Sequence, residues 1–539
     1  MTHWTVLPVV LPAMLGAIIV LATRFHLSLA RVFSMAGTLA LLVLALGLFW
    51  RASDGTISLY QLGDWAAPFG IVLVADRLST LMVLLTALLA VPVVLYAIGS
   101  GWDARGRHFH ALFQFQLMGI MGAFLTGDAF NLFVFFEILL IASYGLMIHA
   151  GGSARLRAGT QYVLYNLLGS TLFLFALGTI YAETGTLNMA DLAVRVAAID
   201  PDASAGIRVA SVLLLAVFAI KAAILPLHFW LPGSYAEAPA PVAALFAIMT
   251  KVGAYGIIRF YTLVFPPELS LTNGLFDTWL LPAALLTLAI GMIGVLGARE
   301  VGRLVAFSAV GSMGMMLIAV AAFTPQGIAA ALYYAVHSTF AAAVLFLVVD
   351  LVRERRGEVA GRLDPTNPMQ GGAMVAGAYF VGAIIMCGLP PLSGFLGKLL
   401  VMDAVRDVAW FGWAWAVILA SSLVAIVGFS RGGSEIFWKS HEVAIGHPGE
   451  ETEAGERNVA DPAAPPAVMQ MVAIGLLIAA SVAATVFAGP LQRTLMATSD
   501  QLFAPEPYIS TVMETPGKTI THGYESAEGD APPTPDEEH

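Results

Sequence analysis

Long apolar runs, separated by short polar stretches, make up most of this 539-residue chain. A helix needs about 20 mainly apolar residues to span a bilayer, and runs of that length recur from the first residues to near the C-terminal end. The pattern predicts an all-α integral membrane protein with about fourteen transmembrane helices. The predicted spans cover residues 5–23, 31–50, 77–98, 109–126, 129–149, 160–182, 208–231, 239–262, 278–298, 302–322, 327–351, 372–400, 410–430 and 467–489.

The stretches outside the spans differ in composition and divide the chain into parts. The segment 53–74 contains several glycines and the alternation of Ile57, Leu59 and Gln61, which predicts an external hairpin. We predict five parts: N-terminal spans with the hairpin (1–76), a central core (77–440), a flexible internal loop (441–466), a last span (467–489) and a mostly disordered external tail (490–539).

The distribution of arginine and lysine predicts the orientation in the membrane. Basic residues are concentrated in alternate loops, and cytoplasmic loops carry such an excess. The bias is consistent only with an even number of spans, so both termini are predicted to lie outside. The first apolar run, from about Val6 to Ala22, follows an uncharged start and lacks a convincing cleavage site. We therefore interpret this run as a span and not as a signal peptide.

Composition excludes several classes of function. The chain is 58% hydrophobic and 12% charged, whereas soluble domains carry about 25% charged residues. The single cysteine, Cys387, excludes a disulfide framework and a multi-cysteine metal site. No histidines or carboxylates have metal-ligand spacing, and no motif for a nucleotide, haem, flavin or iron–sulfur cluster is present. We expect no metal, no cofactor and no nucleic-acid partner.

Three lysines lie within the predicted spans: Lys221, Lys251 and Lys398. A charge at the bilayer centre costs at least about 2.5–3.5 kcal/mol on insertion scales. Arginine serves equally well for pairing, but a buried lysine can lose and regain its proton. Lysines in positions where arginine is avoided therefore indicate a proton relay. The alternative is structural ion pairing between helices.

Glu137 lies in an otherwise apolar run that begins at Asn131. An unpaired carboxylate there is untenable, so the side chain is either protonated or paired with a lysine. We predict a pair that switches as a proton arrives at the lysine; a fixed clamp between helices is the alternative. Asp128, near the end of a span, is predicted to be a helix cap or loop acid.

His337 lies within a long apolar helix, and its unperturbed pKa near neutrality suits proton transfer. A lone histidine is also commonly a hydrogen-bonded core residue, so both interpretations stay open from the chemistry alone. His228 is a similar but weaker candidate, beside Pro226 and Pro232.

Two predicted spans are broken by prolines, one at Pro226 and the other at Pro390 and Pro391. Proline removes a backbone donor, and irregular backbone in a membrane is tolerated only within protein or beside water. Each break is in the fourth span of a five-span block, spans 4–8 and 9–13, and has a lysine close by. Matched breaks indicate two inverted five-helix repeats. Ordinary proline kinks are the alternative.

Together these residues resemble the antiporter-like family that Mrp-type cation/proton antiporters share with the proton-pumping membrane subunits of complex I. The resemblance covers roughly residues 75–440. The family places a glutamate on span 5, lysines on spans 7 and 8, a histidine on span 11 and a lysine or glutamate on span 12. Glu137, Lys221, Lys251, His337 and Lys398 match these positions in turn. The run that contains Glu137 is most similar to the D subunits of the Mrp (Pha, Mnh) antiporters.

The resemblance implies a subunit of a hetero-oligomeric complex in the bacterial cytoplasmic membrane, in which inward proton flow drives sodium or potassium out. It implies that Lys221, paired with Glu137, is the primary proton carrier, Lys251 the central link, His337 the bridge and Lys398 the terminal site. A proton-pumping subunit of a complex I-like dehydrogenase or membrane-bound hydrogenase is the nearest alternative. A passive assembly scaffold is a second one.

The chain departs from the family pattern after the span 11 histidine. Many relatives carry a lysine four or five residues later, where this chain has the alanine run 341–343. The path between the two lysines on either side must therefore use His337, water, or hydroxyls such as those of Ser338 and Thr339.

Overall fold

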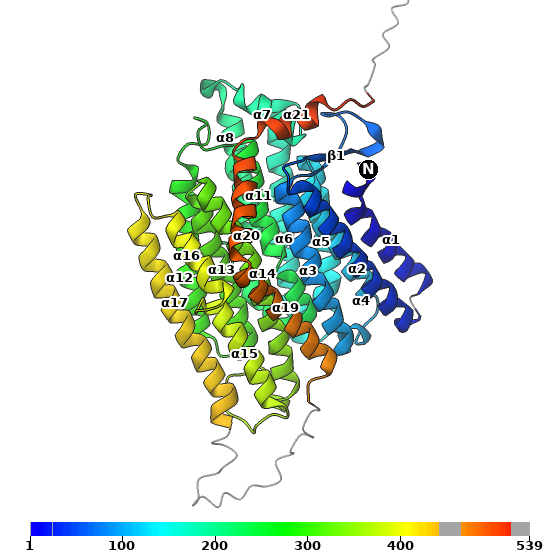
Figure 1. Cartoon of the computed structure of the whole chain (residues 1–539), viewed down its shortest axis with the longest axis vertical. Coiled ribbons are helices and arrows are strands. Elements are labelled where there is room, and N and C mark those ends of the chain that lie inside the picture. The colour runs from blue at the N-terminus through cyan, green and yellow to red at the C-terminus, as the bar shows by residue number, and fades with distance from the viewer. Residues whose placement is uncertain (1, 24, 441–464, 519–539) are drawn as a thin grey trace, which may run out of the picture.

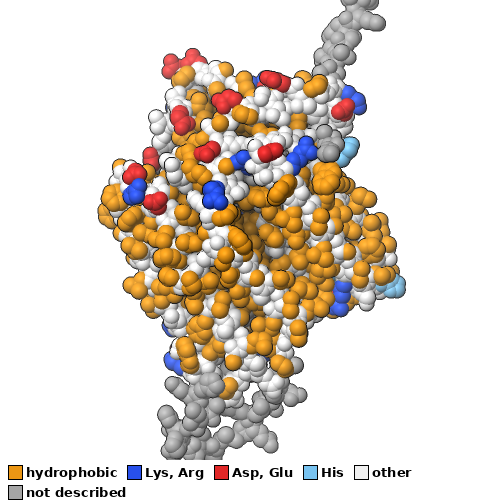
Figure 2. Space-filling view, viewed as in Figure 1, with side chains coloured by type: hydrophobic (Ala, Val, Ile, Leu, Met, Phe, Trp, Pro, Cys, Tyr) orange, Lys and Arg blue, Asp and Glu red, His pale blue; other side chains and the backbone are white. Residues whose placement is uncertain are grey.

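The computed structural model describes residues 2–23, 25–440 and 465–518, and it is a bundle of helices that run roughly along one long axis (Figure 1). Ten of the described helices are long and apolar enough to cross a membrane, and three shorter apolar helices accompany them. A helical membrane protein is thus confirmed. In Figure 2 the middle of the visible face is mainly apolar, and most of the charged side chains lie toward its upper and lower ends.

The N-terminal part contains two paired strands in the segment where a hairpin is predicted. Helices α1 (Leu7–Ala22) and α2 (Leu27–Ala52) are followed by antiparallel strands β1 (Ser58–Gln61) and β2 (Val72–Ala75), in which Leu59 pairs with Val74. Helix α3 (Arg77–Gly99) then begins with a capping box, because the side chains of Asp76 and Ser79 satisfy each other's backbone N–H groups.

The next block contains the first broken span. Asp128 caps α5 (Ala129–Met147) by accepting a 2.7 Å hydrogen bond from the Asn131 N–H, as expected of a helix cap. The elements are α4 (Phe109–Leu125), α5 (Ala129–Met147), α6 (Ser153–Thr184), α7 (Met189–Ala197), α8 (Ala205–Lys221), α9 (Trp230–Glu237), α10 (Ala240–Phe246) and α11 (Met249–Leu263). The short helix α7 was not predicted.

The last block contains the second broken span and the C-terminal helices. Its elements are α12 (Leu281–Gly297), α13 (Val301–Ala321), α14 (Pro325–Glu354), α15 (Gly372–Cys387), α16 (Ser393–Ala404), α17 (Phe411–Gly433), α19 (Val468–Val486), α20 (Ala488–Leu502) and α21 (Glu506–Glu514). Helices α19 and α20 cross the front of the bundle in Figure 1 and pack against α3 and α14.

Two predictions concern segments near the C-terminus. The expectation of a mostly disordered tail over 490–539 is wrong for its first part, because α20 and α21 form there and bury Leu495, Tyr508 and Val512 against the bundle. Residues 519–539, and nearly all of the predicted loop 441–466, lie outside the described residues.

The helices differ sharply in how much of their surface other helices cover. The apolar windows of α10–α11 and α14 are 100% buried and that of α13 is 94% buried, whereas those of α2 and α17 are 33% and 28% buried. Helices α10, α11, α13 and α14 therefore form the interior of the bundle, and α2 and α17 lie at its periphery. Lys251 and His337 lie on these interior helices. Lys221 and Lys398 lie on α8 and α16, which pack against α11 and α14.

Candidate functional site

The first helix break lies directly after Lys221, the last residue of α8. Ala222 N–H still bonds to the Phe218 carbonyl, but the chain then turns, and the Leu225 N–H instead donates to Thr287 Oγ1 on α12 at 2.8 Å. Pro226, in the segment between α8 and α9, cannot donate a backbone hydrogen bond. The break thus leaves Lys221 at a helix end inside the protein, where the residue is 6% exposed.

Lys221 is hydrogen-bonded to a neutral residue. Its Nζ donates to Oδ1 of Asn166 on α6 at 2.9 Å, and it lies 5.5 Å from the centre of the Phe136 ring on α5. The predicted ion pair with Glu137 is not formed: among the described residues, no salt bridge within 4.0 Å joins the two side chains, although their charges interact at longer range. The direct partner of Lys221 is thus the amide of Asn166, and not the carboxylate of Glu137.

Glu137 is a half-buried carboxyl in the middle of α5. Its Oε1 is shielded from solvent and has no hydrogen-bond partner in the described part of the chain. Its charge acts on Lys221 and on Tyr144, which lies further along the same helix. A buried carboxyl oxygen without a partner is costly, so Glu137 is conspicuous among the described residues of α5.

Lys251 lies on α11, is 1% exposed, and makes no hydrogen bond or ion pair through its ammonium group to any described residue. Two residues after Lys251, Gly253 packs closely against the first break at the end of α8. A Cβ atom on Gly253 would lie 2.7 Å from both Ala222 N and Phe218 O and 3.0 Å from the carbonyl carbon of Lys221. Only glycine permits this approach of the two backbones.

His337 is fully buried on α14, and its Nδ1 lies 3.0 Å from Ser393 Oγ, at the start of α16. Its Nε2 has no partner among the described residues. The charges of both Lys398 and Lys251 act on the imidazole. One ring nitrogen of His337 is therefore held in place by Ser393, and the other has no partner in the described part of the chain.

The second helix break separates α15 from α16 and contains Pro390 and Pro391. It frees the Cys387 carbonyl from helical bonding, and this oxygen accepts a 2.6 Å hydrogen bond from Lys398 Nζ. Lys398 also donates to Ser422 Oγ on α17 at 2.8 Å. As at the first break, a buried lysine meets neutral oxygen atoms and no carboxylate.

The auxiliary residues are placed differently. The hydroxyls of Ser338 and Thr339 both donate back to the Ala335 carbonyl of their own helix, at 3.4 and 2.7 Å. His228 lies in the first break and is 4% exposed, and its ring is tilted by 33° against that of Phe229. Its Nδ1 has no partner in the described structure. His228 thus lies in the segment that follows Lys221, and the two hydroxyls follow His337 directly on α14.

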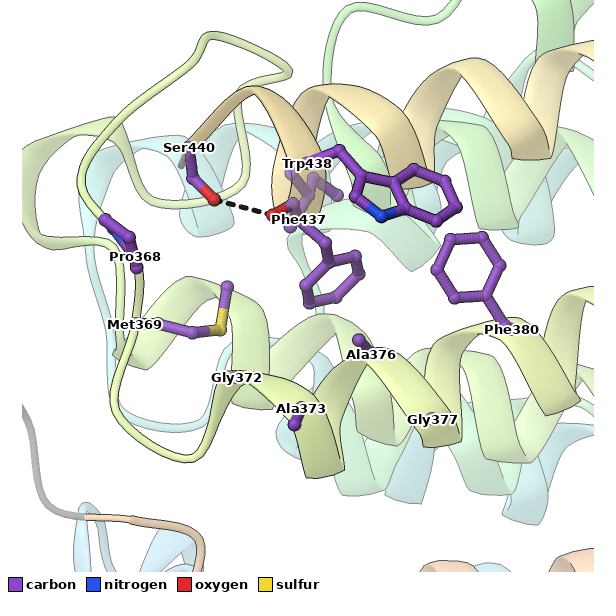
Figure 3. A pocket seen from close by; sticks show the side chains of 11 residues that line it. Pro368, Met369, Gly372, Ala373, Ala376, Gly377, Phe380, Phe437, Trp438 and Ser440 are labelled. Atoms are coloured by element: carbon purple, nitrogen blue, oxygen red, sulfur yellow. Dashed lines mark hydrogen bonds between the residues drawn. The ribbon is translucent and has the colours of Figure 1, made fainter. Parts of the chain in front are cut away.

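A separate apolar cavity of about 390 Å³ lies between α15 and the end of α17. Figure 3 shows it lined by Met369, Phe380, Phe437 and Trp438. It holds none of the charged residues described above, so it is not part of the candidate site.

The neutral partners of the lysines were not identified from the sequence. Asn166 lies within the predicted span 160–182 and Ser422 within the span 410–430, so a polar residue in an apolar run was the available signal. Ser393 lies in the proline-containing segment that was already singled out. Their pairing with Lys221, Lys398 and His337 depends on how the helices pack.

Comparison with known proteins gives a consistent result. The family described as NADH:quinone oxidoreductase/Mrp antiporter, transmembrane, matches residues 126–425. The D subunit of a probable K⁺/H⁺ antiporter from Rhizobium meliloti is 38% identical, over 95% of this chain and 98% of that protein. The D subunit of the Na⁺/H⁺ antiporter from Bacillus subtilis is 39% identical, over 79% and 85%.

Solved structures also resemble the chain. A chain of the Mrp complex from Dietzia sp. superposes with a TM-score of 0.83 at 28% identity, covering 95% of this chain and 100% of that one. A chain of respiratory complex I from Thermus thermophilus gives a TM-score of 0.75 at 25% identity, covering 93% and 99%.

Proposed function

Because the chain belongs to the NADH:quinone oxidoreductase/Mrp antiporter transmembrane family, we propose that its buried lysines carry protons through the D-type subunit of a multisubunit sodium or potassium/proton antiporter. Relatives that match nearly the full length are antiporter D subunits. The chain is a transporter component and not an enzyme, and it works with other subunits of a membrane complex. The redox-pump alternative is not favoured.

The observation that carries this proposal is the buried imidazole of His337, on which the charges of both Lys251 and Lys398 act. An imidazole can accept a proton on one nitrogen and release it from the other. Here Nδ1 is engaged by Ser393 and Nε2 is unpartnered. The alanine run 341–343 follows the histidine on this helix. No lysine at those positions can therefore share the proton transfer with the imidazole.

In the proposed path, protons load at Lys221 under the influence of Glu137, pass to Lys251 across the α8–α11 contact, and reach Lys398 through His337. Three observations support this path. Lys221 and Lys398 donate hydrogen bonds to neutral oxygens, and the charge of Glu137 acts on Lys221 without a salt bridge. Gly253 lets α11 pack closely against the first break. A lysine bound only to neutral groups can lose its proton without leaving a carboxylate unpaired.

We further propose fourteen spans built from two inverted five-helix repeats, α4 to α11 and α12 to α17. Each repeat has its broken span in fourth place, α8–α9 and α15–α16, with a buried lysine beside the break. Both termini would lie outside and the arginine-rich segment 353–362 would lie in the cytoplasm, as the loop charges favour. The complex would lie in the bacterial cytoplasmic membrane.

The test uses everted membrane vesicles from a strain that lacks its own cation/proton antiporters and expresses the complete complex. Addition of NaCl or KCl to respiring vesicles should collapse the pH gradient, and deletion of the gene for this chain alone should abolish the collapse. An unchanged collapse without this chain would refute the proposal. Purification of the complex with redox subunits, in place of small antiporter subunits, would support the alternative.

A further inference from the structure

A buried carboxyl that the proposed path does not use lies near the C-terminal end of α14. Asp350 is 3% exposed and accepts hydrogen bonds from two side chains. The Tyr96 hydroxyl on α3 donates to Oδ2 at 2.9 Å. The Trp102 indole N–H, just after α3, lies 3.0 and 2.9 Å from Oδ1 and Oδ2. Both donors are neutral.

The charged groups around Asp350 are engaged elsewhere. Arg105 lies over the Trp102 ring at 4.1 Å and pairs with Glu354, and Glu354 is also 3.9 Å from Arg355. The other charged and titratable neighbours are likewise paired or hydrogen-bonded: Arg353 to Glu300, Asp103 to Arg31 and His110, His149 to the Trp102 carbonyl, and Arg155 to the carbonyls of His149, Gly151 and Glu237. Among the described residues, no cation forms a salt bridge with Asp350.

Anchoring alone does not require a carboxyl group at this position. An asparagine has an acceptor oxygen for the tyrosine and tryptophan donors and carries no charge. A carboxylate buried without a cationic partner is costly, and ionisable residues within membrane helices are mostly functional. An asparagine would therefore satisfy the two donors at a lower desolvation cost than the aspartate that is present at position 350.

Asp350 also has a defined place relative to the rest of the site. It is on the same helix as His337, and at 1.5 Å per residue the two are separated by about 20 Å along the axis. Asp350 is next in sequence to the arginine-rich segment 353–362, and it lies one helical turn before the partly exposed Glu354. It is thus the deepest carboxyl at this end of α14.

We propose that Asp350 is the group that exchanges protons with the cytoplasm at this end of the subunit, an inference that rests on the proposed function. The carboxylic acid gives its proton to a water molecule on the cytoplasmic side, so its O–H bond breaks and hydronium forms; reprotonation from inside reverses the step. Tyr96 and Trp102 stabilise the resulting carboxylate.

The test compares Asp350→Asn, Asp350→Glu and Tyr96→Phe in the complete complex, in everted vesicles, across a range of pH. Asp350→Asn should assemble but lose antiport by about tenfold or more, as expected for a group that transfers protons. Asp350→Glu should retain part of the activity. Tyr96→Phe removes one donor to the carboxylate, so Asp350 should hold its proton to a higher pH and the activity profile should move the same way.

A structural anchor predicts a different pattern. Wild-type rates and a wild-type pH profile in Asp350→Asn would overturn the inference, and so would an unchanged profile in Tyr96→Phe if Asp350→Asn fails to assemble. Either result leaves the proposed function intact, because that proposal fails only if the unmodified complex gives no cation-dependent collapse of the pH gradient. Thr171→Ala, an exposed hydroxyl on α6, is the matched control.

Discussion

Lys221 Nζ donates a 2.9 Å hydrogen bond to Oδ1 of Asn166, across the contact between α8 and α6. The acceptor is neutral and buried, and it is itself held by a 2.8 Å bond from its Nδ2 to the Tyr162 carbonyl. The lysine is therefore oriented by a group that stays in place whether or not the lysine carries its proton. Glu137 supplies charge without direct contact.

The first prediction concerns this acceptor. Asn166→Leu removes a hydrogen bond to a charged group, which contributes about 1.5–3 kcal/mol, so antiport should fall about tenfold or more. Asn166→Asp should also be impaired, because a carboxylate in contact would hold the lysine charged. Cation-induced collapse of the pH gradient in everted vesicles measures both. Thr171→Ala on the same helix should behave as wild type; normal transport in Asn166→Leu would show that Lys221 needs no oriented acceptor.

The second prediction concerns the carboxyl of Glu137. Glu137→Ala should abolish antiport while the complex still assembles, because Oε1 already lacks a partner and its removal breaks no hydrogen bond made by that atom. The measurement is the same vesicle assay, with the amount of purified complex as the assembly check. Asp403→Asn, which alters a carboxylate that is 70% exposed, is the control. Near-normal transport in Glu137→Ala would remove this residue from the path.

The third prediction concerns the imidazole. His337→Ala should reduce transport sharply, since it interrupts the connection between the lysines on either side, and His337→Lys should retain part of it. Ala341 and Ala342 are both buried, so a lysine at either position enters the interior of the bundle. We expect Ala341→Lys or Ala342→Lys to rescue His337→Ala in part. Normal transport by His337→Ala would mean that protons bypass this helix.

The fourth prediction concerns the contact between α8 and α11. In Gly253→Ala the new methyl group would lie 2.7 Å from backbone atoms of Ala222 and Phe218, which cannot rotate away. Overpacking of this kind costs about 1–3 kcal/mol. The resulting separation of α8 from α11 should lower the transport rate by more than any decrease in the amount of assembled complex explains. The matched control is Gly178→Ala, where nothing lies within 4 Å of the new atom. Equal behaviour of the two variants would show that this close approach is not needed.

Much of the fold could be predicted because lipid imposes a simple rule on the sequence. The expected span 129–149 is helix Ala129–Met147, and the expected span 327–351 is Pro325–Glu354. The rule fails for α7, α20 and α21, which pack against the bundle but are not long apolar helices of the kind that crosses a membrane. Their helices depend on tertiary contacts, such as that of Tyr508 with Arg259, which no local pattern reveals.

The charged residues of the site could be predicted for the same reason, since a lysine in an apolar run is conspicuous. Their partners could not. Asn166 and Ser422 are neutral, and such residues in membrane helices often bond only to their own backbone, as Ser338 and Thr339 do. The assignment of Glu137 as the direct partner of Lys221 followed charge complementarity, but the packing of α6 against α8 places an amide there.

The central claim is that Lys221 moves a proton, and Lys221→Arg tests it most directly. Arginine keeps the positive charge and can still reach a neutral oxygen, but it does not deprotonate in proteins. Antiport by everted vesicles should therefore be lost in Lys221→Arg nearly as fully as in Lys221→Ala, with both complexes assembled at wild-type levels. Retention of most of the wild-type rate by Lys221→Arg would show that the site needs only a fixed charge, and it would contradict the account.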